Sequence, residues 1–209
     1  VKNPPGDVYA KYVSELLQDR WRTYMRNFPP LVRLLATRVI LWINSLGEFV
    51  ERIKDDRARI EETFSPGSPL GKLVKGGRGV SDSHNGARAV VVCEFENGVK
   101  IVYKPRSMSV DVAWLDIISW INSKYADSNP MRSLKVIDCG KYGWMEFADH
   151  QPCESKDEVA TYYKNMGVLL SAIHCLQGND FHLENVVANR SMPIAIDLET
   201  ISVPEALTY

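Results

Sequence analysis

The first third of the chain has apolar residues at helical spacing in three successive segments. Tyr12, Leu16 and Leu17 mark the first segment, which a Phe-Pro-Pro break at 28–30 ends. An apolar stripe over 31–42 marks the second, and a charged run with one apolar side over 48–62 marks the third. Because apolar positions three or four residues apart form one face of a helix, we expect three helices between residues 7 and 64.

The middle of the chain has the residue pattern of β-strands. Residues 89–95 and 99–103 are rich in Val, Ile and Tyr and flank Asn97-Gly98, the strongest short hairpin signal. Two further strands are expected at 134–138 and 144–147, with an amphipathic helix over 110–125 before them. The stretch 70–88 has several glycines and is expected to be a loop, following a turn-rich joint at 65–69. We place a domain boundary there, between a helical region 1–66 and an α+β core 67–209.

The last third predicts a helix, a loop and a hairpin. Ser155 followed by Glu158 is a capping box that opens a long helix, and Gly178 is expected to end it. After the loop, the apolar runs 186–188 and 194–196 predict a hairpin. Its second strand ends at Asp197.

Composition narrows the class of protein. The 209 residues are 45% hydrophobic with a formal charge of −1 and no basic block, which argues against nucleic acid as a partner. The most apolar stretch is interrupted by Arg33 and Arg38, so no membrane span is expected, and no cleavable signal is visible. The chain begins at Val1 and stops at Tyr209, soon after an acidic cluster, so we expect a fragment of a longer protein.

The four cysteines lie far apart without a C-x-x-C pair. This spacing favours reduced thiols in a cytoplasmic protein, and no zinc site is expected.

The candidate chemistry lies between Gly178 and Thr200. Asp180 precedes Asn185 by five positions, the spacing of the catalytic Asp and the metal-binding Asn in protein kinases, and Asp197 follows after an apolar run. Carboxylate and amide oxygens suit Mg²⁺. A polar turn between helix and hairpin is the alternative.

Three residues upstream join the candidates. Lys104 ends an apolar strand, as a phosphate-binding lysine of a kinase does, although a lysine at a sheet edge would look the same. The next helix has no Glu to pair it, so Asp111 or Asp116 would have to substitute. Asp82 and His84 stand two apart, a pairing suited to acid and base catalysis or simply part of a hydrophilic loop.

Several motifs, in order, resemble one known family. SDSHNGAR, VYKPRSMS, GWMEF, GNDFHLEN and AIDLET are similar to the dehydratase domain of the class II lanthipeptide synthetases, the LanM type. The resemblance implies a fold like that of lipid kinases, with an N-lobe sheet and part of a C-lobe. It also implies ATP- and Mg²⁺-dependent phosphorylation of Ser and Thr in a precursor peptide, followed by phosphate elimination. The expected partners are that peptide with its leader and a C-terminal cyclase domain of the parent chain.

The resemblance also implies roles for the candidates. Phosphorylation would use Asp180 as the base and His182 to position the loop, and elimination would use Asp82, His84 and Lys104. The nucleotide and metal would be held by Lys104, Asn185, Asp197 and, as an additional carboxylate near the metal, Glu199.

Two other classes of protein stay open. A small-molecule or lipid kinase would use the same loop without eliminating phosphate. A catalytically silent peptide-binding scaffold would be consistent with the missing Glu.

Overall fold

The computed structural model describes residues 6–78, 86–124 and 131–201. Asp82 and His84 lie outside these ranges. The chain divides into two compact units, residues 1–54 with 83–88 and residues 55–82 with 89–209. Helices and antiparallel sheets are both present, which confirms the α+β class.

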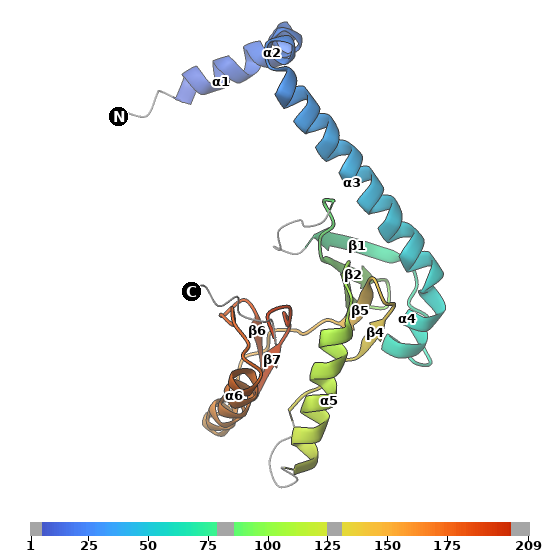
Figure 1. Cartoon of the computed structure of the whole chain (residues 1–209), viewed down its shortest axis with the longest axis vertical. Coiled ribbons are helices and arrows are strands. Elements are labelled where there is room, and N and C mark those ends of the chain that lie inside the picture. Colours follow the sequence, from blue (N-terminus) through green and yellow to red (C-terminus); the bar gives the residue numbers. More distant parts are fainter. Residues whose placement is uncertain (1–5, 79–85, 125–130, 202–209) are drawn as a thin grey trace, which may run out of the picture. The chain divides into compact units, whose positions relative to one another are not determined.

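The first unit is helical (Figure 1). Helix α1 (Gly6–Glu15) continues through a π-helical segment, η1 (Leu16–Arg20), into α2 (Trp21–Asn27). Phe28 is not helical, as the Phe-Pro-Pro break predicts, and α3 (Pro29–Asp55) follows. The predicted start of a separate helix at residue 48 is wrong, because α3 runs through Gly47. One helical glycine costs only about 1 kcal/mol, and the ion pair between Glu48 and Arg52, one turn apart, supports the helix beyond it.

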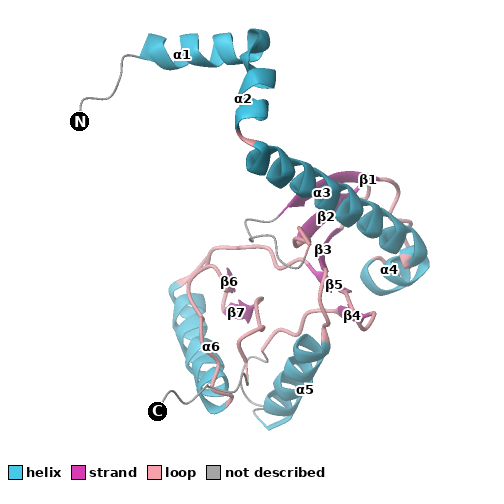
Figure 2. Cartoon of the chain, turned by 45° about the horizontal axis from the view of Figure 1, so that its top comes forward, coloured by secondary structure: helices cyan, strands magenta, loops and turns pink. Residues whose placement is uncertain are grey.

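The second unit begins with α4 (Arg57–Phe64) and contains a five-stranded sheet (Figure 2). Every neighbouring pair is antiparallel, in the order β1-β2-β3-β5-β4. The strands are β1 (Leu73–Arg78), β2 (Val91–Phe95), β3 (Lys100–Lys104), β4 (Val136–Asp138) and β5 (Gly143–Glu146).

Strand β1 corrects the prediction of a loop over 70–88. It lies at the sheet edge and pairs with β2, with an irregular register between Leu73 and Lys75. Its sequence, LVKGGR, has weak strand propensity. The backbone hydrogen bonds to β2 outweigh that local preference.

The β2–β3 hairpin forms where Asn97-Gly98 predicts it. Gly98 has φ +82°, which a glycine adopts without strain, and its amide donates to the Phe95 carbonyl at 2.9 Å. The Asn97 side-chain oxygen accepts from the Val99 amide at 3.1 Å. Strand β3 ends at Lys104 and lies in the sheet interior, between β2 and β5.

Helix α5 (Ser109–Lys124) buries Trp114, Ile118 and Ile121 in a core shared with α6 (Lys156–Cys175). Ser155 caps α6 by accepting a hydrogen bond from the Glu158 amide at 3.1 Å, as the capping box predicts. Strands β6 (Val186–Asn189) and β7 (Met192–Ala195) pair as the predicted hairpin, and α6 packs beside β7 (Figure 1). Over the described ranges, every helix is too short or too polar to cross a bilayer.

The end of α6 differs in detail from the prediction. Gln177, and not Gly178, has the left-handed backbone, with φ +54°. The Gly178 amide donates to the Ile173 carbonyl at 2.9 Å. A Cβ on Gly178 would lie 2.8 Å from the Phe181 ring, so close packing requires the glycine.

Candidate functional site

Lys104 is buried and forms two specific contacts. Only 6% of its side chain is exposed. Its ammonium donates to Asp111 Oδ1 at 3.0 Å and to the Ile196 carbonyl at 2.7 Å. The partner that the sequence left open is thus Asp111, on the first turn of α5. Lys104, at the end of β3, is therefore hydrogen-bonded both to α5 and to the residue directly before Asp197.

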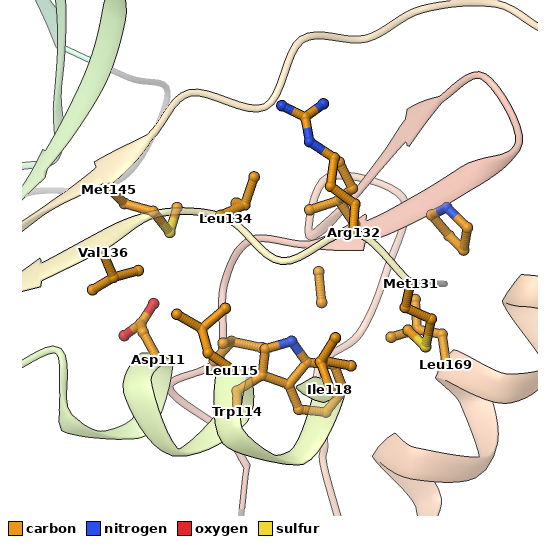
Figure 3. A pocket seen from close by; sticks show the side chains of 14 residues that line it. Asp111, Trp114, Leu115, Ile118, Met131, Arg132, Leu134, Val136, Met145 and Leu169 are labelled. Carbon is orange, nitrogen blue, oxygen red and sulfur yellow. The ribbon is translucent and has the colours of Figure 1, made fainter. Parts of the chain in front are cut away.

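Asp111 lies between apolar side chains and two cations. Its side chain is 1% exposed, and it accepts from Arg106 Nη1 at 2.7 Å in addition to Lys104. On its other side Asp111 borders a small cavity of about 20 Å³, where its carboxylate lies near Val136 and Met145 (Figure 3). The surrounding side chains come from α5, α6, the sheet and β7, so little water screens this carboxylate.

Arg106 joins three carboxylates. Besides Asp111, its Nε lies 2.5 Å from Glu199 Oε1, and its Nη2 lies 3.8 Å from Asp197 Oδ1. The Nη2 atom is buried and has no hydrogen-bond partner among the described residues. This arginine therefore faces both acidic residues that follow β7. It stands two positions after Lys104, and the sequence reasoning missed it.

The electrostatics of the two cations differ. Burial lowers the pKa of the Lys104 ammonium below its ordinary value, and the attraction of Asp111 offsets this only in part. Burial also acts to lower the pKa of Arg106, but Asp111 and then Glu199 outweigh it, so that pKa is raised. Arg106 is therefore a permanent charge, whereas Lys104 loses its proton more readily than an exposed lysine does.

The loop before β6 is held by its own polar groups. Asp180 has φ +60°, and its carbonyl accepts from Asn185 Nδ2 at 2.7 Å. His182 Nδ1 accepts from the Glu184 amide at 3.3 Å, and Nε2 lies 3.8 Å from Asp180 Oδ1. The side chains of Asp180 and His182 are 69% and 48% exposed, so both are open to a substrate.

The backbone brings the loop to the exit of β7. The Ile196 amide donates to the Asn185 carbonyl at 3.0 Å, which extends the β6–β7 pairing by one residue. Asn185 thus lies opposite the residue before Asp197. The side chains of Asp197 and Glu199 are 52% and 58% exposed.

These oxygens are the donors that Mg²⁺ prefers. The residues fit a magnesium ion by the chemical type of their donors, because the half-exposed carboxylates of Asp197 and Glu199 and the amide of Asn185 lie on adjoining segments. Among residues 6–78, 86–124 and 131–201, no group of three His, Cys, Asp or Glu side chains could hold a metal ion. A magnesium ion here would therefore need further oxygens, such as phosphate and water.

The structure thus brings Lys104, Asp197 and Glu199 together through Arg106 and Asp111, with the Asp180–Asn185 loop adjoining them. Asp82 and His84 lie outside the described residues, so their relation to the site stays a prediction. The catalytic and metal-binding roles assigned from the sequence also stay predictions.

The chain belongs to a family described as a domain of unknown function, DUF4135, whose model matches residues 28–208. It is similar to the lacticin 481/lactococcin biosynthesis protein LcnDR2 of Lactococcus lactis subsp. lactis, with 34% identity over 127 residues. The match covers 57% of this chain and 14% of that protein. These findings confirm the resemblance to the lanthipeptide synthetases, and the chain is a segment related to them.

Proposed function

We propose that the chain is part of the dehydratase of a class II lanthipeptide synthetase. It would phosphorylate Ser and Thr of a precursor peptide at the expense of ATP and then eliminate the phosphate. The observation that carries this proposal is the buried Lys104, bonded both to Asp111 and to the backbone next to Asp197. A lysine fixed in this way, beside half-exposed carboxylates, is what phosphoryl transfer requires.

The fold is proposed to be kinase-like. Three features of the described chain support this: an antiparallel sheet with a lysine at the end of β3, a helix whose carboxylate pairs that lysine, and a loop and hairpin that lead to Asp197. Asp111 takes the place of the usual Glu. It lies within the first turn of α5, close enough for the shorter side chain to reach Lys104.

Asn185 and Asp197 would hold Mg²⁺, with Glu199 as a further oxygen donor. The metal would neutralise charge on the phosphates of ATP. Lys104 would contact those phosphates through the third N–H of its ammonium, because its two protein acceptors use only two. Asp180, exposed and held in a strained backbone conformation, would accept the proton of the substrate hydroxyl.

Elimination requires a base for the α-proton and cations for the departing phosphate. Asp82 and His84 would act on the proton and Lys104 on the phosphate. The proposed peptide partner carries a leader, and a cyclase domain of the parent chain would act next. The cytoplasm, where ATP is available, is the proposed location.

Two variants of the full-length protein separate the half-reactions. Asp197→Asn should leave a Ser- and Thr-containing precursor peptide unmodified, because the metal loses a carboxylate. His84→Ala should accumulate phosphopeptide, because transfer continues and elimination stops. Asp116→Asn and His174→Ala are matched controls, since both residues are exposed and lie on α5 and α6, and both should produce dehydrated peptide.

Intact mass after incubation with Mg-ATP is the measurement. Only unmodified peptide from His84→Ala would refute its assignment to elimination. Stable phosphorylation by the unaltered protein would indicate a plain kinase instead. No binding of Mg-ATP would indicate the silent scaffold.

A further inference from the structure

The contacts of Arg106 suggest a role toward the metal that the proposed function does not include. Its guanidinium forms a short ion pair with Glu199 and faces Asp197, the two carboxylates proposed as metal ligands. A guanidinium and a divalent cation cannot both lie at these oxygens without repelling each other. The ion pairs of this arginine with the proposed metal ligands therefore oppose metal binding.

We propose that Arg106 competes with the metal for Glu199 and so sets the affinity of the site for divalent cations. This inference rests on the proposed function. Without the metal, Arg106 neutralises the acidic pair; when the metal binds, Glu199 leaves the guanidinium. Binding and release are coupled, because each cation weakens the hold of the other on the same carboxylate.

The other contacts of Arg106 explain why it can lose the ion pair with Glu199 and stay in place. Its Nη1 donates to Asp111 at 2.7 Å and to the Ser107 carbonyl at 3.0 Å. Asp111 is itself fixed by Lys104. Arg106 therefore keeps its position when Glu199 departs, and its positive charge stays near the site.

The exposure of the partners shows which contact would break. Asp111 is 1% exposed, so losing its pairing would leave a buried charge uncompensated. The Glu199 side chain is 58% exposed, so it can turn to water or to a metal at little cost. The Arg106–Glu199 pair is thus the weaker of the two, although its ion-pair distance is the shorter.

Binding of Mn²⁺ to the full-length protein tests this, with the free ion followed by electron paramagnetic resonance. The measurement is made without nucleotide, and with a fixed concentration of ATP for every variant if the unaltered protein binds the ion only in its presence. Arg106→Gln should bind Mn²⁺ more tightly, on the order of tenfold, because Glu199 no longer has to leave a guanidinium before it can bind the ion. Arg106→Lys keeps the charge and should stay within about threefold of the unaltered protein. Arg132→Gln is the matched control: it breaks another Arg–Glu pair, to Glu146 at 2.6 Å, and should not change the affinity.

A double variant identifies the carboxylate. In a Glu199→Gln background there is no charge for Arg106 to hold, so adding Arg106→Gln should have a smaller effect than it has alone. An undiminished effect would overturn the assignment to Glu199. Thermal unfolding of each variant shows whether it is folded, and Arg106→Met, which also removes the charge and keeps an unbranched side chain, replaces Arg106→Gln if that variant is not.

The possible failures are distinguishable. If the unaltered protein binds Mn²⁺ but Arg106→Gln binds it equally or more weakly, Arg106 is not a competitor and the inference is wrong, while the metal site stands. If the unaltered protein binds no Mn²⁺ with or without ATP, the proposed metal site fails and the inference fails with it.

Discussion

Replacing Asp111 by Asn tests the central ion pair of the site. The change keeps the size of the side chain and removes its charge, leaving Lys104 and Arg106 without their shared buried counter-ion. Asp116→Asn is the matched control, because it makes the same chemical change at an exposed position of the same helix.

The expected loss follows from the burial of the pair. Removing one partner of a buried ion pair costs about 3–5 kcal/mol. Here Lys104 keeps the Ile196 carbonyl and Arg106 keeps Glu199, and the amide oxygen of Asn can still accept one hydrogen bond. We therefore expect a loss near the lower limit, about 3 kcal/mol, for Asp111→Asn and less than about 0.5 kcal/mol for Asp116→Asn.

Urea unfolding followed by tryptophan fluorescence measures this difference. The dependence on pH gives a second test. Burial already lowers the pKa of Lys104, and removing the Asp111 charge lowers it further. The unfolded chain then binds more protons than the folded one, so stability rises as the pH rises toward the ordinary lysine value of about 10.4. The deficit of Asp111→Asn should thus shrink between neutral and alkaline pH; equal losses for the two variants at neutral pH would refute the reasoning.

Two further pairs of sites give sharp contrasts. Gly178→Ala should lower the free energy of unfolding by about 1–3 kcal/mol, because its Cβ would meet the Phe181 ring at 2.8 Å. Gly167→Ala, in open space within α6, should raise it by up to about 1 kcal/mol. Urea unfolding compares the two variants, and higher stability in both would contradict the close packing at Gly178. Burial raises the pKa of the Cys93 thiol to about 12, so at mildly alkaline pH Cys93 stays protonated and inaccessible to reagent. Iodoacetamide should therefore label the exposed Cys175 and not Cys93, which peptide mass spectrometry measures. Rapid labelling of Cys93 in the folded protein would contradict its burial.

Local sequence signals predicted much of the fold because they act over a few residues. Asn97-Gly98 specified a hairpin, and Ser155 with Glu158 specified a helix start, each through contacts within the segment itself. Strand β1 could not be predicted in this way. Its pairing with β2 bridges residues far apart in sequence, and its own glycines favour a turn.

The arrangement of the candidate site was predictable in part for the same reason, whereas the roles of its residues stay predictions. The spacing of Asp180, Asn185 and Asp197 is a local signal, and the register of β6 and β7 brings their segments together. The partner of Lys104 depended on where α5 packs, which the sequence did not determine. Arg106 was missed because an arginine after Pro105 has no distinctive local pattern; its importance comes from Asp111 and Glu199, which reach it from different elements.

The most direct test of the proposed dehydratase is the intact mass of a Ser- and Thr-containing precursor peptide, with its leader, after incubation with the full-length protein, ATP and Mg²⁺. The account predicts successive losses of water that require both ATP and the metal. A stable gain of phosphate, or an unchanged mass although the peptide and Mg-ATP bind, would contradict it.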